Sequence, residues 1–103
     1  MDGAIVVTDK PEAARYEIAV DGQRVGLVTY RLSPGKISFT HAEVNPAQEG
    51  QGLGSRLAQY ALDDARARGL SVRPLCPFVA AFIEDHPDYA DLVADEDRAR
   101  LGL

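Results

Sequence analysis

The sequence has few residues able to cross-link the chain or bind a metal. It contains one cysteine, Cys76, and two histidines among 103 residues. A single cysteine cannot form an internal disulfide, and without a cluster of cysteine and histidine a structural zinc site is not expected. Hydrophobic residues make up 46% of the chain, enough to form a core that needs neither disulfides nor a bound zinc ion for stability.

Long apolar runs are also missing. No stretch approaches the ~20 residues that a membrane helix requires. The short apolar run near the N-terminus has acidic residues on both sides, unlike a signal peptide. We therefore expect a cytoplasmic protein without a membrane partner. Because a domain typically spans ~100 to 150 residues, residues 1–103 are predicted to form one domain.

Basic residues are in the minority, and they are scattered. Eleven Lys and Arg face sixteen Asp and Glu, for a formal net charge of -5. Binding nucleic acid requires a concentrated basic surface, so we expect no nucleic-acid partner. An acidic surface mildly favours a cationic partner such as an amine or a basic peptide, although such a charge more often serves solubility.

The first half of the chain is predicted to be an antiparallel meander. A short strand at 4–7 is expected to be interrupted by residues 9–12. Asp21-Gly22 then separates two alternating apolar runs, 15–20 and 23–30, which is a strong signal for a type I′ hairpin.

A second turn at 33–35 leads into a strand over 37–44. Strict alternation predicts Ile37, Phe39, His41 and Glu43 on one face, and Ser38, Thr40, Ala42 and Val44 on the other.

The second half alternates helix and strand. Apolar residues at helical spacing predict a helix that begins near Leu53 and ends before Gly69. A strand at 70–75 follows, and a strand, helix, strand succession implies parallel pairing. A second helix is expected to begin at Pro77 and to end before Pro87. The charged tail is expected to hold a short strand or helix.

Three glycines at alternate positions, Gly50, Gly52 and Gly54, precede the first helix. Without side chains there, the amides of residues 50–55 and the positive end of the helix dipole can converge on a phosphate or pyrophosphate. The alternative is a tight turn with ordinary capping glycines. The nucleoside-triphosphate loop is excluded because its Lys-Ser/Thr pair is missing, and the dinucleotide motif lacks its acidic ribose partner.

The segment "EGQGLGSRLAQYAL", after a strand that ends in "AEVNP", resembles the acetyl-coenzyme-A motif of the GNAT acetyltransferases. The motif of that family is Gln/Arg-x-x-Gly-x-Gly/Ala, and Gly52 and Gly54 match its last two glycines. The resemblance extends to "PLCPF" and covers most of the chain, in the manner of the compact branch of about a hundred residues. The sequence departs from the family pattern at Glu49, where the family usually has Gln or Arg. It also has no room for the helices that form part of the acceptor site in larger members.

The resemblance implies an α/β fold. The sheet would be mixed and twisted, mostly antiparallel, with a central parallel strand pair and two main helices. Acetyl-coenzyme A would lie with its pantetheine arm between the two splayed parallel strands, and its thioester carbonyl would contact a backbone amide from Ala42 to Val44. Phe78 and Phe82 are expected in the core, with one of them touching the pantetheine arm. Contacts with the coenzyme are expected at Glu43, Val44, Gly50, Gln51, Gly52, Leu53, Gly54, Ser55 and Phe78.

The resemblance also brings His41 and Cys76 to the acetyl group, as the reactive side chains at the ends of the two parallel strands. His41 is a candidate general base, because histidine changes its charge near neutral pH, or else a half-buried structural residue. Cys76 lies at a predicted helix start, which favours a thiolate, but a lone cysteine on an apolar stripe is usually a core residue. The sequence does not decide whether Cys76 accepts the acetyl group, donates a proton or only lines the tunnel for the pantetheine arm.

The predicted function is transfer of an acetyl group from acetyl-coenzyme A to a primary amine, on a small molecule or a protein. The oligomeric state is expected to be a monomer or a weak dimer. One alternative is a non-catalytic acyl-coenzyme-A-binding or regulatory module, and another is a protein-interaction domain that retains only the fold. Fold alone does not separate these three.

Overall fold

Strands β1 to β5 form a single sheet in the order β1-β2-β3-β4-β5. The computed structural model describes residues 4–48 and 52–101. The strands are β1 (Ile5–Lys10), β2 (Arg15–Val20), β3 (Gln23–Ser33), β4 (Lys36–Val44) and β5 (Ser71–Pro74). The helices are α1 (Leu53–Ala67), α2 (Pro77–Asp85) and α3 (Asp95–Leu101), with short 3-10 turns at Pro11–Ala13, Pro46–Gln48 and Pro87–Leu92.

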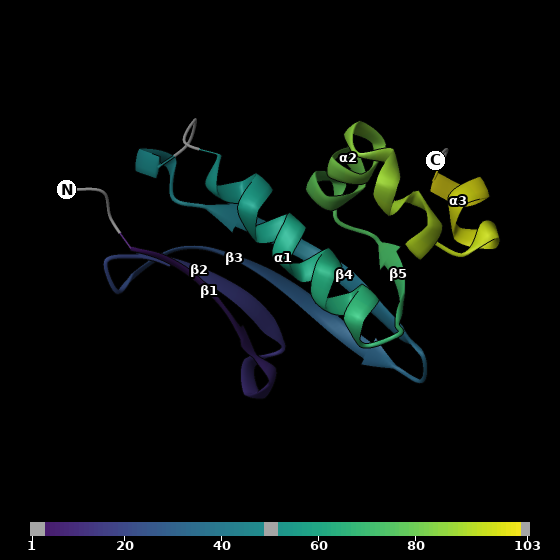
Figure 1. Ribbon diagram of the computed structural model, residues 1–103, viewed down its shortest axis with the longest axis horizontal. Coiled ribbons are helices and arrows are strands. Elements are labelled where there is room, and N and C mark those ends of the chain that lie inside the picture. The colour runs from purple at the N-terminus through teal and green to yellow at the C-terminus, as the bar shows by residue number, and fades with distance from the viewer. Residues whose placement is uncertain (1–3, 49–51, 102–103) are drawn as a thin grey trace.

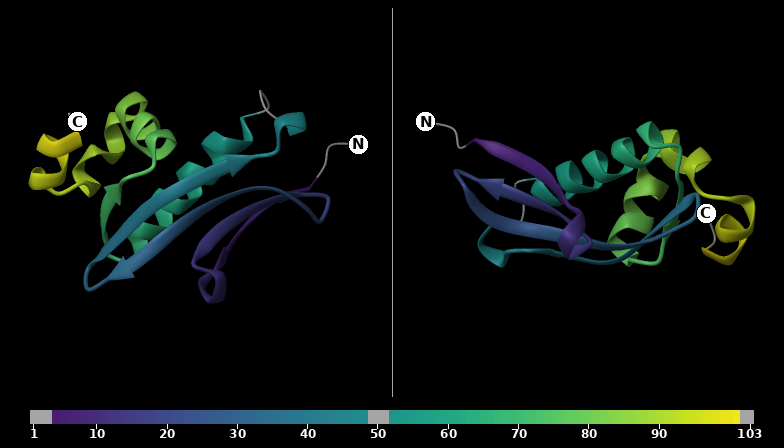
Figure 2. Two further views of the ribbon diagram at one scale, coloured as in Figure 1. Left: turned by 180° about the vertical axis from the view of Figure 1, so that it is seen from behind. Right: turned by 90° about the horizontal axis from the view of Figure 1, so that it is seen from below.

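Helices α1 and α2 lie on the same face of the sheet (Figures 1 and 2). Their apolar residues and the inward residues of the strands form one core, which includes Tyr16, Ile18, Phe39, Leu57 and Leu62. The opposite face is uncovered over most of β1 to β4, and in the part of the chain described here only α3 reaches it, at one corner. We call it the open face. No helix in the described ranges is long and apolar enough to cross a membrane.

The Asp21-Gly22 hairpin is confirmed. Both residues have positive φ, 51° and 82°, as a type I′ turn requires. The first strand, however, is longer than predicted, because pairing with β2 continues to Lys10, opposite Arg15. It stops only at Pro11, which has no N–H to donate.

A β-bulge in β4 overturns the predicted alternation of that strand. Thr29 lies opposite His41 and Tyr30 lies opposite Phe39, so Thr40 is an extra residue. Beyond the bulge the two faces are exchanged, and Ala42 rather than His41 packs against the core. The prediction that His41 and Glu43 share a face with Phe39 was wrong. Both side chains lie on the open face, 60% and 65% exposed.

The parallel pair is β4 with β5, over Lys36–Phe39 and Ser71–Pro74. It lies at one end of the sheet rather than at its centre, since the described chain beyond β5 adds only an isolated bridge from Val93 to Val72. At this corner α3 inserts Asp97, which is 3% exposed. The Asp97 carboxylate lies 3.1 Å from Lys36 Nζ and 3.3 Å from Arg73 Nε, so two cations offset the burial of its charge.

Two buried tyrosines connect the sheet to neighbouring carboxylates. The Tyr16 hydroxyl donates to Asp64 of α1 at 2.5 Å, and the Tyr30 hydroxyl donates to Asp9 at 2.7 Å. Burial, and then the hydrogen bond to each carboxylate, raise the pKa of both tyrosines well above the usual value. Arg68 lies 3.4 Å from Asp64 and 3.7 Å from Asp9, and it links the two pairs.

These tyrosines predict a loss of stability in alkali. Above pH ~10 the unfolded chain releases the phenol protons while the folded chain keeps them, so the free energy of unfolding falls as pH rises, by up to ~1.4 kcal/mol per pH unit for each tyrosine. Denaturant titrations between pH 9 and 11 should show this slope. The double variant Tyr16→Phe/Tyr30→Phe should have a lower free energy of unfolding at pH 8, and that free energy should fall less steeply with pH above pH 10. Tyr60→Phe, at a 43% exposed side chain, is the control and should keep the slope.

Candidate active site

A gap opens where β4 and β5 stop pairing. The last link between them is the Cys76 amide, which donates to the Phe39 carbonyl at 2.9 Å. From there β4 continues to Val44, whereas β5 has ended and α2 begins at Pro77. The free edge of β4 beyond Phe39 therefore faces the gap.

The hydrogen-bond alternation in β4 decides which amides point into this gap. The Asn45 amide donates to the Val25 carbonyl of β3 at 2.7 Å. In an antiparallel pair, residues whose amides point toward the partner strand alternate with residues whose amides point away from it. Glu43 therefore also turns its amide toward β3, whereas Ala42 and Val44 turn theirs away from β3. Two amides of the predicted segment, those of Ala42 and Val44, are thus directed at the gap.

The start of α1 supplies a second group of free amides. Gly52 begins the helix with φ 74°, and the first bond within the helix runs from the Arg56 amide to the Gly52 carbonyl at 3.1 Å. The amides of Leu53, Gly54 and Ser55 therefore have no acceptor within the helix, and no side chain of the described residues caps them. Their position and the helix dipole suit an anion. Gly50 and Gln51, predicted for the same site, lie outside the described residues, as does Glu49.

Gly54 has a packing role that the sequence does not reveal. A Cβ atom at this position would lie 2.8 Å from Cζ of Phe78, so the missing side chain lets the starts of α1 and α2 approach closely. The expectation that Phe78 lies in the core was wrong, because the residue is 43% exposed. Phe82 is in the core, 7% exposed. Phe78 instead presents an apolar surface beside the free amides of α1.

His41 and Cys76 lie in different surroundings. Nε2 of His41 is 3.4 Å from Oε1 of Glu43, two residues along β4 on the open face. Cys76 is the N-terminal cap residue of α2 and is 3% exposed, within the core. In the described chain no hydrogen bond or ion pair joins His41 to Cys76. A chemical role for either residue remains a prediction.

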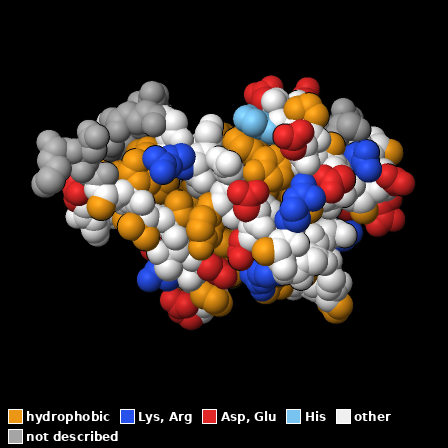
Figure 3. All heavy atoms as spheres, viewed as in Figure 1, with side chains coloured by type: hydrophobic (Ala, Val, Ile, Leu, Met, Phe, Trp, Pro, Cys, Tyr) orange, Lys and Arg blue, Asp and Glu red, His pale blue; other side chains and the backbone are white. Residues whose placement is uncertain are grey.

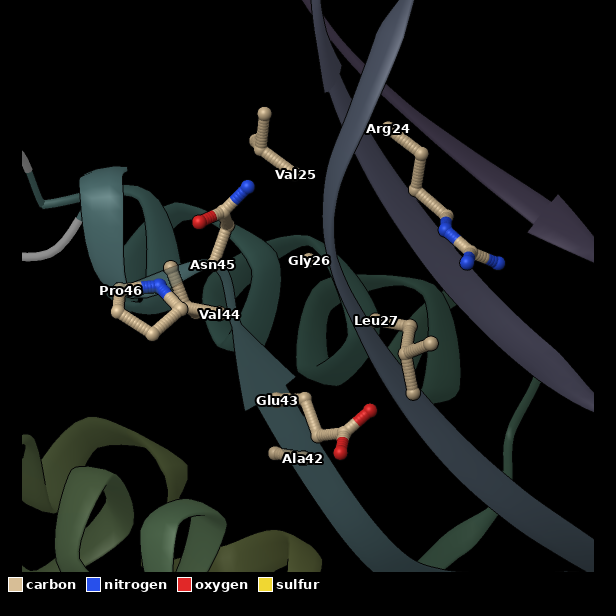
Figure 4. A pocket seen from close by; sticks show the side chains of 9 residues that line it. All are labelled: Arg24, Val25, Gly26, Leu27, Ala42, Glu43, Val44, Asn45 and Pro46. Atoms are coloured by element: carbon tan, nitrogen blue, oxygen red, sulfur yellow. The ribbon is translucent and has the colours of Figure 1, made fainter.

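A groove of about 590 Å³ lies where the end of β4 meets β3. Figure 4 shows Leu27 and Glu43 projecting from these neighbouring strands, with Arg24 beyond Leu27. Sequence reasoning did not single out Arg24, because its place in one groove with Glu43 depends on the register of β3 with β4 and on a bulge at Val25.

The acidic character of the chain is concentrated elsewhere. Figure 3 shows acidic side chains gathered around α2 and α3, where Glu84, Asp85, Asp88, Asp91, Asp95 and Glu96 lie. The described residues include no group of three His, Cys, Asp or Glu side chains placed to hold a metal ion. The open face carries Arg15, Arg24 and Arg31 on β2 and β3 together with Glu17 and Glu43.

The sequence and the fold are both similar to those of known proteins. Residues 15–92 match the family described as GCN5-related N-acetyl-transferase. The fold is similar to that of a GCN5-like putative N-acetyltransferase from Staphylococcus aureus, with a TM-score of 0.68, 23% identity, and coverage of 86% of this chain and 87% of that one. It is also similar to the ribosomal-protein-S18-alanine N-acetyltransferase of Escherichia coli, with a TM-score of 0.56 and 18% identity over 58% of this chain. The match spans only 39% of the Escherichia coli enzyme. No curated protein matches the sequence.

The burial of Cys76 leads to a prediction of its own. Cys76→Ala should lower the free energy of unfolding by about 1 kcal/mol, as expected for loss of a small buried side chain. The kcat per folded molecule should change by less than about twofold, because the Cys76 side chain is 3% exposed and packs in the core. Thermal unfolding and steady-state kinetics on the same preparation measure both effects. A tenfold or larger fall in kcat with unchanged coenzyme affinity would instead assign the thiol a chemical role.

Proposed function

Because the chain belongs to the GCN5-related N-acetyltransferase family, we propose that it transfers the acetyl group of acetyl-coenzyme A to a primary amine. The observation that carries the proposal is that two sets of free amides border one gap, since Gly54 at the start of α1 lies against Phe78, just after the turn at Cys76. The first set belongs to the unpaired edge of β4, and the second to the uncapped start of α1.

The amides of Leu53, Gly54 and Ser55 bind the pyrophosphate, for which an uncapped helix N-terminus is suited. Ala42 and Val44 pair with the pantetheine arm as a neighbouring strand would, and one of their amides donates to the thioester carbonyl. Phe78, exposed beside the start of α1, covers one side of the arm. Since α1 occupies the covered side of the sheet, the amine approaches from the open face.

His41 is the general base of this proposal. It lies on the open face, one residue before the amide of Ala42, and so on the side from which the amine arrives. The amine nitrogen forms a bond to the acetyl carbon, and the carbon–sulfur bond breaks. His41 takes the proton that the nitrogen loses and returns it to the departing thiolate, which balances the reaction. Glu43, 3.4 Å from Nε2, orients the imidazole.

The test is release of coenzyme thiol from acetyl-coenzyme A, measured with and without a panel of primary amines. We expect release that depends on the amine, with the acetylated amine detected by mass spectrometry. Coenzyme binding by calorimetry without turnover of any amine would point to the non-catalytic binding module. Absence of binding would leave only a shared fold.

A further inference from the structure

The groove on the open face has an unusual charge arrangement. Of the residues that line it, Arg24 and Glu43 are the charged ones, and they have opposite signs. They do not pair with each other, since the ion pairs of the described residues connect Arg24 to Glu17 and Glu43 to His41. Leu27 lies between them, opposite Glu43 in the β3–β4 register. The groove thus has a cationic end, an apolar middle and an anionic end.

The guanidinium of Arg24 remains available to a ligand. Its contact with Glu17 is long, 3.5 Å, and the same carboxylate oxygen of Glu17 lies closer to Arg15 Nε, at 2.7 Å. The Arg24 side chain is 49% exposed. Because a guanidinium has five N–H donors in a planar fork, most of them are free to bind a carboxylate in two-point fashion.

The distance between the two ends sets the size of the ligand. Arg24 lies three positions before Leu27, and one of these positions is absorbed by the bulge at Val25. At ~3.3 Å per residue along the strand and ~4.8 Å between strands, the Cα atoms of Arg24 and Glu43 are on the order of 10 Å apart. Both side chains can reach toward each other from that distance. A short aliphatic chain with a charge at each end can therefore lie over Leu27 and span the distance between Arg24 and Glu43.

We propose that this groove binds the acceptor, and that the acceptor carries a carboxylate at the end remote from its primary amine, as an ω-amino acid does. The inference rests on the proposed function. Glu43 binds the ammonium group beside His41, and Arg24 binds the carboxylate while Leu27 contacts the methylene chain. His41 first passes one ammonium proton to solvent, and the neutral amine then reacts as described above. An acceptor with a second positive charge in place of the carboxylate is disfavoured, because Arg24 lies at that end of the groove.

The test uses a matched pair of acceptors, 6-aminohexanoate and hexylamine, which differ in the carboxylate. We expect kcat/KM with acetyl-coenzyme A to be at least tenfold higher for 6-aminohexanoate. Arg24→Gln should remove this preference by raising the KM for 6-aminohexanoate about tenfold, with little effect on hexylamine. Arg24→Glu should reverse the preference in favour of 1,6-diaminohexane. Arg31→Gln, an exposed arginine of the same strand outside the groove, is the control and should leave all rates unchanged.

Binding is measured separately, so that this proposal and the proposed function can fail independently. In the coenzyme-A complex, 6-aminohexanoate should shift the amide resonances of Leu27 and Glu43, and Arg24→Gln should abolish the shift. Equal turnover of both amines, or shifts that survive in Arg24→Gln, would overturn the acceptor assignment and leave the acetyltransferase intact. Shifts dependent on Arg24 without turnover would retain the binding site and overturn the enzymatic function. Absence of both shifts and turnover would overturn both.

Discussion

His41→Gln is expected to lower kcat by about 10²-fold, the contribution that a positioned acid–base group commonly makes. The dissociation constant for acetyl-coenzyme A should change by less than about twofold, because His41 lies on the open face and the coenzyme amides lie along the gap and at the start of α1. Glutamine retains polarity and similar length, so the loss is specific to the base.

The other histidine provides the control. His86 stacks on Phe82, with ring centroids 4.0 Å apart, and its Nδ1 lies 2.9 Å from the Phe82 carbonyl at the end of α2. His86→Gln should reduce thermal stability slightly and leave kcat within twofold. Full activity in His41→Gln, with its fold intact, would remove His41 from the mechanism and leave the amides of the gap as the only catalytic element.

Gly52→Asp is expected to weaken coenzyme A binding at least tenfold. A charge at this position would stand beside the free amides of Leu53, Gly54 and Ser55 and compete with the pyrophosphate for them. Gly52 is a better choice than Gly54. A side chain at Gly52 meets no atom of the described residues within 4 Å, whereas one at Gly54 collides with Phe78.

Gly52→Asn is the matched control. Gly52 has φ 74°, and Asn and Asp are the residues other than glycine that best tolerate this left-handed conformation. The two variants therefore share the same backbone strain and nearly the same shape, and they differ in charge. Calorimetry at low salt should give a dissociation constant at least tenfold larger for Asp than for Asn, and the difference should shrink as salt is added. Equal affinities would place the pyrophosphate elsewhere.

The elements of this fold follow from local sequence signals. The Asp21-Gly22 pair fits the two positive φ values of a type I′ turn, and the glycines before Leu53 mark the start of α1. The strand, helix, strand order from β4 to β5 implies the parallel pair. The glycine motif also indicated the family, because the residues that form an anion site at a helix N-terminus are adjacent in the sequence. Signals of this kind act over a few residues, and they do not require the rest of the chain.

The composition of the site depended on contacts between distant residues. The bulge at Thr40 moved His41 and Glu43 to the open face, and a sequence period of two residues cannot reveal a single extra residue in a strand. The contact of Gly54 with Phe78 required α1 and α2 to pack against each other. Arg24 reached the groove through the register of β3 with β4. Each of these outcomes was decided by packing and strand pairing across the sheet. A shift of one position in a strand moves a side chain to the other face, and so decides whether it can take part in the site.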